Sequence, residues 1–228
     1  MLKSSTSFAA YLRYSTSGFA VLLLILMAIA WQPYVRIDLL TGDPAAIEDF
    51  PLYFGVLSHV GVLMWAMGAS ICLFSAMLLD LWQTNADSSR FLRVFGWLSL
   101  LMCLDDLFLL HERVFPVMFR DSQEAVLFSY AVMIIVLIWT FRKIIVRYQP
   151  LFFVISLCLF SFSVFIDLIP SEITNSLLSM VFQSKFNGIR FLLEDGPKLL
   201  GIFSWLSYFA WVSVVSLTDA KETSIYPT

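Results

Sequence analysis

Long apolar stretches recur along the chain and are separated by short polar segments. A helix that crosses a membrane needs about 20 mostly apolar residues. Five stretches reach about that length and carry few charged residues; they lie near residues 14–35, 55–80, 124–142, 149–168 and 195–218. We therefore predict a membrane-spanning helix in each of them.

A sixth stretch, near residues 91–112, differs because it cannot cross a membrane without carrying charge. Only 11 residues lie between Arg93 and Asp105, which is too few for a span. A span here must include Asp105 and Asp106 and continue to about Glu112. We predict that it does so, and that both acids lie inside the membrane.

The distribution of basic residues supports six spans with both termini in the cytoplasm. In this arrangement the inner side holds Lys3, Arg13, Arg90, Arg93, Arg142, Lys143, Arg147 and Lys221. The outer side holds Arg36, Arg113, Arg120, Lys185 and Arg190. This excess agrees with the positive-inside rule, whereas five spans would place the basic segment 142–147 outside. The first stretch resembles a signal peptide but is long enough to span, so we interpret it as an uncleaved helix.

Residues 173–189 have a different pattern, with apolar side chains at helical spacing among Ser, Asn, Gln and Lys. This pattern predicts an amphipathic helix on the outer surface of the membrane. The expected fold class is all-α: a polytopic membrane helical bundle of six transmembrane helices and this surface helix. Residues 1–228 are expected to form one integral-membrane domain.

Composition supports a lipid environment and argues against nucleic acid as a partner. The chain is 60% hydrophobic and 14% charged, whereas soluble domains are about 25% charged. Its mean hydropathy is +0.84. The net charge is −3 and no basic patch stands out, so binding to nucleic acid is not expected. The lipid bilayer is the first expected partner, and the cell membrane the expected location.

Ionisable residues are predicted to meet at one depth, towards the outer side. Successive spans run in opposite directions, so the outer ends of four of them carry ionisable residues. These are His59 on the second span, Asp105 and Asp106 on the third, Asp167 on the fifth, and Glu194, Asp195 and Lys198 at the sixth. On a continuous helix Asp105 would share a face with Glu112, and Asp106 with Arg113. His111 would then point about 120° away from Asp105. Glu194 and Lys198 are four residues apart and could pair, and Pro197 would stand near the start of its helix.

Acids inside a membrane are costly to insert, by roughly 2.5–3.5 kcal/mol at the centre, and so are candidate functional residues. We take Asp105, Asp106 and Glu194 as candidate catalytic residues. His59, His111, Glu112 and Asp195 are the candidate metal ligands. Carboxylate and imidazole groups together suit a divalent metal such as zinc, manganese or iron.

The stretches "LDDLFLLHE" and "LEDGPKLLG" together resemble an uncharacterised class of bacterial multi-span membrane proteins. That resemblance implies a bacterial inner membrane and carries no activity. Ser58, His59 and Asp105 give a faint similarity to alkaline ceramidase-like membrane hydrolases, but the C-terminal His-x3-His pair of that family is missing. Glu194-x3-Lys198 is similar to the acid–lysine spacing of microbial rhodopsins, but a seventh span is lacking.

Three functions remain open from the sequence. The first is a metal-dependent hydrolase or lipid-modifying enzyme embedded in the membrane, acting on a lipid or a small extracytoplasmic substrate. The second is a proton or cation transporter, a channel or a sensing subunit. The third is a non-catalytic scaffold that packs against other membrane subunits. Whether the protein is an enzyme is therefore left undecided at this stage.

Overall fold

The computed structural model describes residues 55–119, 123–169 and 189–225, together with positions 20, 24, 27, 28 and 31–34. Side chains are not described at residues 112, 116, 119, 123, 124, 189–194 and 223–225. In the first 54 residues, which form a unit of their own, the described positions 20, 24, 27, 28 and 31 are helical. These positions agree with the predicted first helix, most of which lies outside the described residues.

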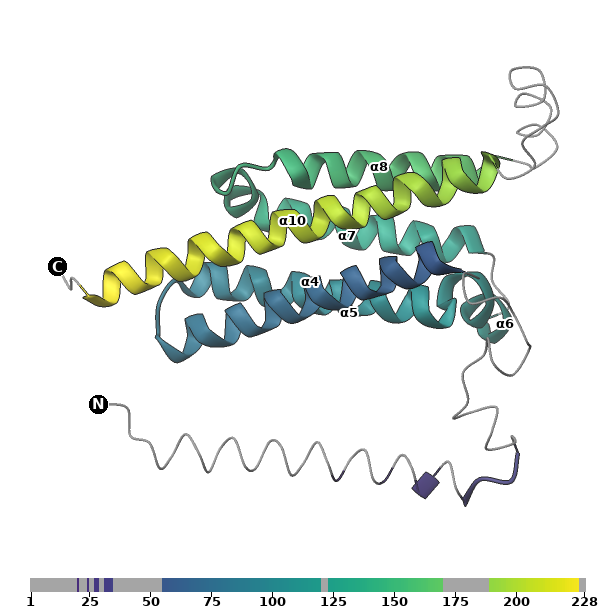
Figure 1. The fold of residues 1–228 in the computed structure, drawn as a ribbon, viewed down its shortest axis with the longest axis horizontal. Coiled ribbons are helices and arrows are strands. Elements are labelled where there is room, and N and C mark those ends of the chain that lie inside the picture. Colours follow the sequence, from purple (N-terminus) through teal and green to yellow (C-terminus); the bar gives the residue numbers. More distant parts are fainter. Residues whose placement is uncertain are drawn as a thin grey trace. The chain divides into compact units, whose positions relative to one another are not determined.

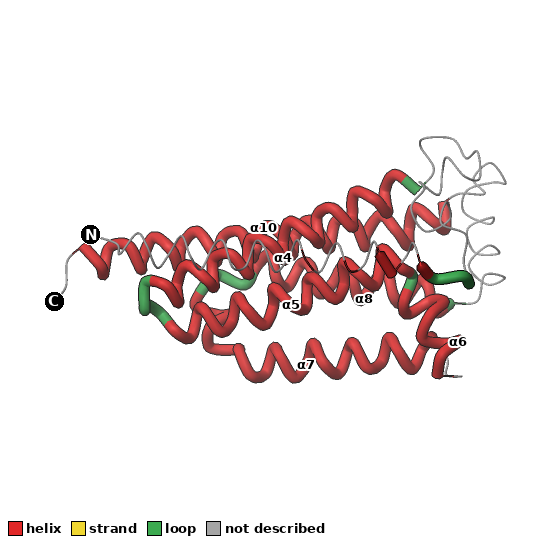
Figure 2. Tube along the Cα trace, turned by 90° about the horizontal axis from the view of Figure 1, so that it is seen from below, coloured by secondary structure: helices red, strands yellow, loops and turns green. Residues whose placement is uncertain are grey.

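The second unit is a bundle of five long helices among its described residues. They are α4 (Val56–Leu81), α5 (Ala86–Phe108), α7 (Gln123–Arg147), α8 (Leu151–Leu168) and α10 (Ile189–Ile225). Two short helices, η1 (Leu110–Val114) and α6 (Phe115–Phe119), connect α5 to α7. The views in Figures 1 and 2 show the long helices running alongside one another, with α10 between α8 and α4 and with α5 beside α4. The described residues of this unit form no strand, so an all-α fold is confirmed for them.

Four of the described helices are long and apolar enough to cross a membrane: α4, α7 from Ala125, α8, and α10 from Asp195 to Glu222. Helix α5 is not among them, because it carries charged residues near both ends. Helix α5 nevertheless contacts α4 from end to end. Ser89 donates to the carbonyl of Ala76 at one end, and the Cys103 thiol donates to the carbonyl of Val62 near the other.

Several helices extend beyond the spans predicted within them. Helix α5 begins at Ala86, five residues before the predicted start, because the Asn85 side chain accepts a hydrogen bond from the backbone N–H of Ser88 and caps the helix. Helix α7 continues through the basic segment to Arg147. Helix α10 begins at Ile189 and contains Pro197 in its interior, although proline removes one backbone hydrogen bond there. The amphipathic helix predicted at residues 173–189 lies almost entirely outside the described residues.

Aromatic rings fill the centre of the bundle. Phe95, Phe153, Trp205 and Phe209 are each at most 2% exposed, and the Trp205 and Phe209 ring centroids are 4.9 Å apart. Packing is tightest where glycine allows it. A Cβ atom at Gly96 would lie 2.8 Å from the Leu73 side chain, so a larger residue would push α5 away from α4.

Candidate functional site

Helix connectivity brings one end of each long helix to the same end of the bundle, which we call the site end. Here lie the first turns of α4, α7 and α10 and the last turns of α5 and α8, as Figure 1 shows. Asp105 and Asp106 are therefore close to residues that are far away in the sequence. Asp106 of α5 and Lys198 of α10 form an ion pair there, and Asp195 interacts electrostatically with both of them and with Asp167 of α8. Ionisable groups from three helices therefore lie near one another, as the sequence predicted.

Asp105 is buried and forms hydrogen bonds with two neighbouring helical elements. Asp105 is only 3% exposed. Oδ1 accepts hydrogen bonds from the backbone N–H of His111 at 2.9 Å and from the hydroxyl of Tyr130 at 3.1 Å. Oδ2 lies 2.5 Å from Nδ1 of His111. A carboxylate can only accept, so these contacts fix both the position and the orientation of the His111 ring.

The contact between Asp105 and His111 depends on a break in the helix. Leu109 has φ 52° and ψ 45°, a left-handed conformation that ends α5 and costs about 1–2 kcal/mol for a residue with a Cβ. The next turn, η1, is a π-helix. The expectation of a continuous helix was therefore wrong here. Instead of pointing about 120° away, His111 is turned back onto Asp105.

Asp106 faces the opposite direction, towards α4 and α10. Its Oδ1 lies 2.7 Å from Nζ of Lys198, and its Oδ2 accepts a hydrogen bond from the indole N–H of Trp65 at 3.0 Å. The Asp106 side chain is 10% exposed and that of Lys198 is 36% exposed. Arg113, which would share a face with Asp106 on a continuous helix, is exposed. Lys198 is the cation that pairs with Asp106.

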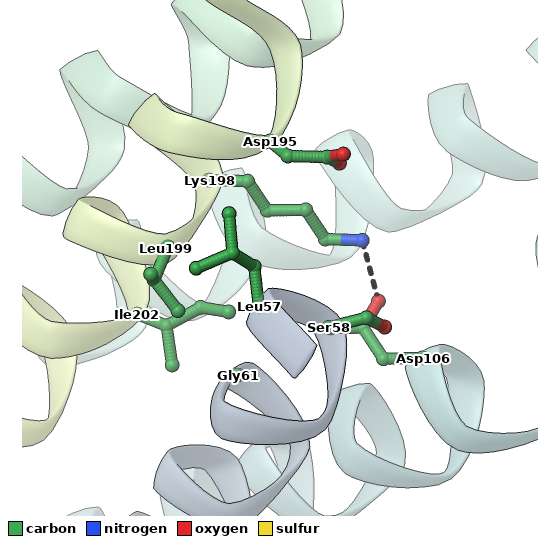
Figure 3. A pocket seen from close by; sticks show the side chains of 8 residues that line it. All are labelled: Leu57, Ser58, Gly61, Asp106, Asp195, Lys198, Leu199 and Ile202. Carbon is green, nitrogen blue, oxygen red and sulfur yellow. Dashed lines mark ion pairs between the residues drawn. The ribbon is translucent and has the colours of Figure 1, made fainter. Parts of the chain in front are cut away.

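A small pocket lies between α4, α5 and α10, shown in Figure 3. Its volume is about 30 Å³, enough for one or two water-sized groups. One part of its wall is apolar and the other is polar or charged; the lining residues are Leu57, Ser58, Gly61, Asp106, Asp195, Lys198, Leu199 and Ile202. The carboxylate of Asp195 and the ammonium of Lys198 extend on the same side in Figure 3.

Negative charge exceeds positive charge around this pocket. The Asp195 carboxylate is close enough to Lys198, Asp106 and Asp167 to interact electrostatically with all three. Two carboxylates, Asp106 and Asp195, and one ammonium group, Lys198, are therefore the charged groups among the described residues that line the pocket. Because the surroundings are partly apolar, these charges are screened less than on an open surface.

The remaining predicted residues are only partly placed. His59 is exposed and does not line the pocket, although its neighbour Ser58 does. The side chains of Glu112 and Glu194 lie outside the described residues, so their assigned roles and the predicted pairing of Glu194 with Lys198 stay predictions. Among the side chains that the structure describes, no group of three His, Cys, Asp or Glu residues is placed to hold a metal.

Two residues of the site were missed by sequence reasoning: Trp65 and Tyr130. Both sit in apolar segments, where aromatic residues are usually packing or belt residues. The available signal was chemical, since an indole N–H or a phenol hydroxyl inside a span needs a hydrogen-bond partner. An acid on a neighbouring span is such a partner.

Comparison with known proteins places the chain in a family without assigning it an activity. A family model described as a domain of unknown function (DUF8692) matches residues 17–212. This match covers more than half of the chain, so the chain belongs to that family. No curated protein and no solved structure matches the chain.

Proposed function

We propose that, as a member of the DUF8692 family, this protein is an integral membrane protein that binds a small cation at the site end and acts as a sensing subunit. The observation that carries the proposal is the pairing of the adjacent acids. Asp105 contacts His111 and Tyr130, whereas Asp106 contacts Lys198 and Trp65. A change in charge at either acid would therefore alter the packing between different helices.

The excess of acid around the pocket favours a cation as the ligand. Lys198 neutralises one carboxylate, and Asp195 adds a second acid to the pocket lining. A small cation that enters there would be attracted by Asp195 and would compete with Lys198 for Asp106. The small volume of the pocket suits an ion or an ammonium group better than a large substrate.

Aromatic packing favours sensing over conduction. The site end and the opposite end of the bundle are separated by Phe95, Phe153, Trp205 and Phe209, whose rings pack against one another. A cation that binds at the site end would have to displace these rings to cross. A response at one membrane face needs no such displacement.

The charge distribution supports an outward-facing site, with α5 as a further span. Among the described residues, the opposite end carries Arg90, Arg93, Arg142, Lys143, Arg147 and Lys221, and the site end carries Arg113, Arg190 and Lys198. The positive-inside rule then places the opposite end in the cytoplasm. Because α5 contacts α4 along its length, it would cross with α4. With the first helix this makes six spans and a cytoplasmic N-terminus.

Cation titration of the purified protein in nanodiscs tests this proposal. Sodium, potassium, ammonium, magnesium and calcium would be titrated at constant ionic strength while tryptophan fluorescence is recorded. We expect a saturable signal that is much reduced in Trp65→Phe, because the Trp65 indole contacts Asp106. Asp195→Asn should weaken binding by about tenfold, equivalent to about 1.4 kcal/mol. The absence of a saturable signal for every cation would contradict the proposal.

A metal-dependent hydrolase is a second candidate, favoured by the contact between Asp105 and His111. Histidines that bind metals commonly donate one ring N–H to a carboxylate and bind the metal through the other nitrogen. Nδ1 of His111 lies 2.5 Å from Oδ2 of Asp105, and Glu112 is the next residue. Stoichiometric zinc, manganese or iron that is lost in His111→Ala would support this candidate. The same low metal content in both proteins after metal loading would count against it.

A further inference from the structure

The break at Leu109 is not explained by the local sequence. No proline and only one glycine, Gly96, occur in residues 86–115, and the next proline, Pro116, follows Leu109 by seven residues. A proline disturbs the helix up to the carbonyl four residues before it, which here is residue 112. Leucine, glutamate and arginine, which make up much of residues 107–113, are good helix formers. The local helix propensity therefore favours a helix that continues through residue 109, and a side-chain contact must hold the break.

Asp105 provides that contact. In a continuous α-helix the backbone N–H of His111 would donate to the carbonyl of residue 107. In the structure it donates instead to Oδ1 of Asp105, and the His111 ring contacts Oδ2. The N–H of Leu109 donates to the carbonyl of Asp105, a bond that a continuous helix would keep. In the broken conformation the Asp105 side chain thus takes the place of the helical acceptor of the His111 N–H.

We infer that residues 109–114 form a two-state turn, in which the Asp105 carboxylate holds the broken conformation and its release lets α5 continue through this segment. The inference rests on the proposed function for its trigger, a cation that competes with Lys198 for Asp106 and so shifts the helical turn that carries both acids. Asp105 and Asp106 are adjacent on one turn, so the trigger and the turn are directly connected. The two-state turn itself rests on the backbone geometry.

A distance measurement on the full chain in nanodiscs tests the turn. Spin labels would be attached at Trp97→Cys on α5 and Val117→Cys on α6, two positions that are 59% and 81% exposed. Exposed Cys158 would be replaced by serine, and buried Cys72 and Cys103 kept. A continuous α-helix would separate the Cα atoms of residues 97 and 117 by about 30 Å, from 20 residues at 1.5 Å each. The broken turn should give a shorter distance.

Asp105→Leu should move the distance towards about 30 Å, because leucine cannot accept either His111 hydrogen bond and favours a helix. The matched control is Asp106→Leu, the same change one residue away, which should leave the distance short. Adding Leu109→Gly to Asp105→Leu should restore the short distance, because glycine adopts the left-handed conformation freely and disfavours the helix. This restored distance also distinguishes a switch from misfolding.

The outcomes separate this inference from the proposed function. A longer distance in Asp105→Leu that is reversed by Leu109→Gly supports the two-state turn, even if no cation changes the distance. An unchanged distance in Asp105→Leu overturns it, even if a cation binds the pocket. Equal lengthening in Asp105→Leu and Asp106→Leu also overturns it, because the effect would then not depend on the contact with His111.

Discussion

The two ends of the helix bundle hold their polar groups in different ways. At the site end, Asp106 is 10% exposed and pairs with Lys198 across two helices far apart in sequence. At the opposite end, Asp80 pairs with Arg93 across a short connection, and their side chains are 48% and 50% exposed. Each pair joins a carboxylate to a cation, an ammonium in the first and a guanidinium in the second, and the first pair is the more buried.

The buried polar groups at the opposite end are neutral. The Tyr148 hydroxyl joins Ser88 and Ser216 through hydrogen bonds of 2.8 and 3.0 Å. Hydroxyl groups cost less to bury than charges and can satisfy one another completely. Buried charge, which costs more free energy than buried hydroxyl groups, is thus concentrated at the site end. This difference is the reason why we propose a structural role for the opposite end and a functional role for the site end.

Replacing Lys198, the cationic residue of the site-end ion pair, should have the largest effect on stability. Lys198→Met leaves the Asp106 charge with only the Trp65 indole as a described partner. Breaking a buried ion pair costs about 3–5 kcal/mol. Because Lys198 is partly exposed, we expect the free energy of unfolding to fall by about 3 kcal/mol, the lower end of this range. Denaturant unfolding in detergent micelles, followed by circular dichroism, measures this loss.

The double variant Lys198→Met with Asp106→Leu is the control for this prediction. It removes both charges, so much of the lost stability should return, because apolar groups can replace a buried ion pair at little cost. A single variant as stable as the natural protein would show that burial of this pair adds nothing. The proposed contrast between the two ends would then fail.

The second prediction concerns the hydroxyl network at the opposite end. Tyr148→Phe keeps the ring but removes the hydroxyl that joins Ser88 and Ser216. We expect a loss of about 1–3 kcal/mol in the free energy of unfolding, the cost of leaving buried polar groups without a partner. Cation binding at the site end should be unchanged, because Tyr148 lies at the other end of α7.

Tyr208→Phe is the matched control for Tyr148→Phe. The Tyr208 hydroxyl donates a single, longer bond of 3.3 Å to the carbonyl of Ile145, so its loss should cost less than that of Tyr148. A change in cation affinity in Tyr148→Phe would show that the two ends are coupled. That result would weaken the assignment of a purely structural role to the opposite end.

Hydrophobic patterning was sufficient to predict the helices and their meeting at one end, because alternation of apolar spans determines which ends lie together. The contacts of the site residues were harder to predict. Residues 104–113 favour a continuous helix locally, and the break at Leu109 depends on Asp105, His111 and Tyr130 together. Tertiary contacts of this kind override local preference. Trp65 was missed for the same reason, since its partner lies 41 residues away.

The smallest effect is expected for the exposed ion pair at the opposite end. Arg93→Gln removes the cation that pairs with Asp80, while Ser89 still donates a hydrogen bond to that carboxylate at 2.5 Å. Exposed ion pairs contribute about 0–1 kcal/mol, so the free energy of unfolding should fall by no more than about 1 kcal/mol, and by less in high salt. Denaturant unfolding at low and high salt, alongside Lys198→Met, measures both pairs under the same conditions. Equal losses in the two variants would mean that burial does not distinguish the two ends of the bundle.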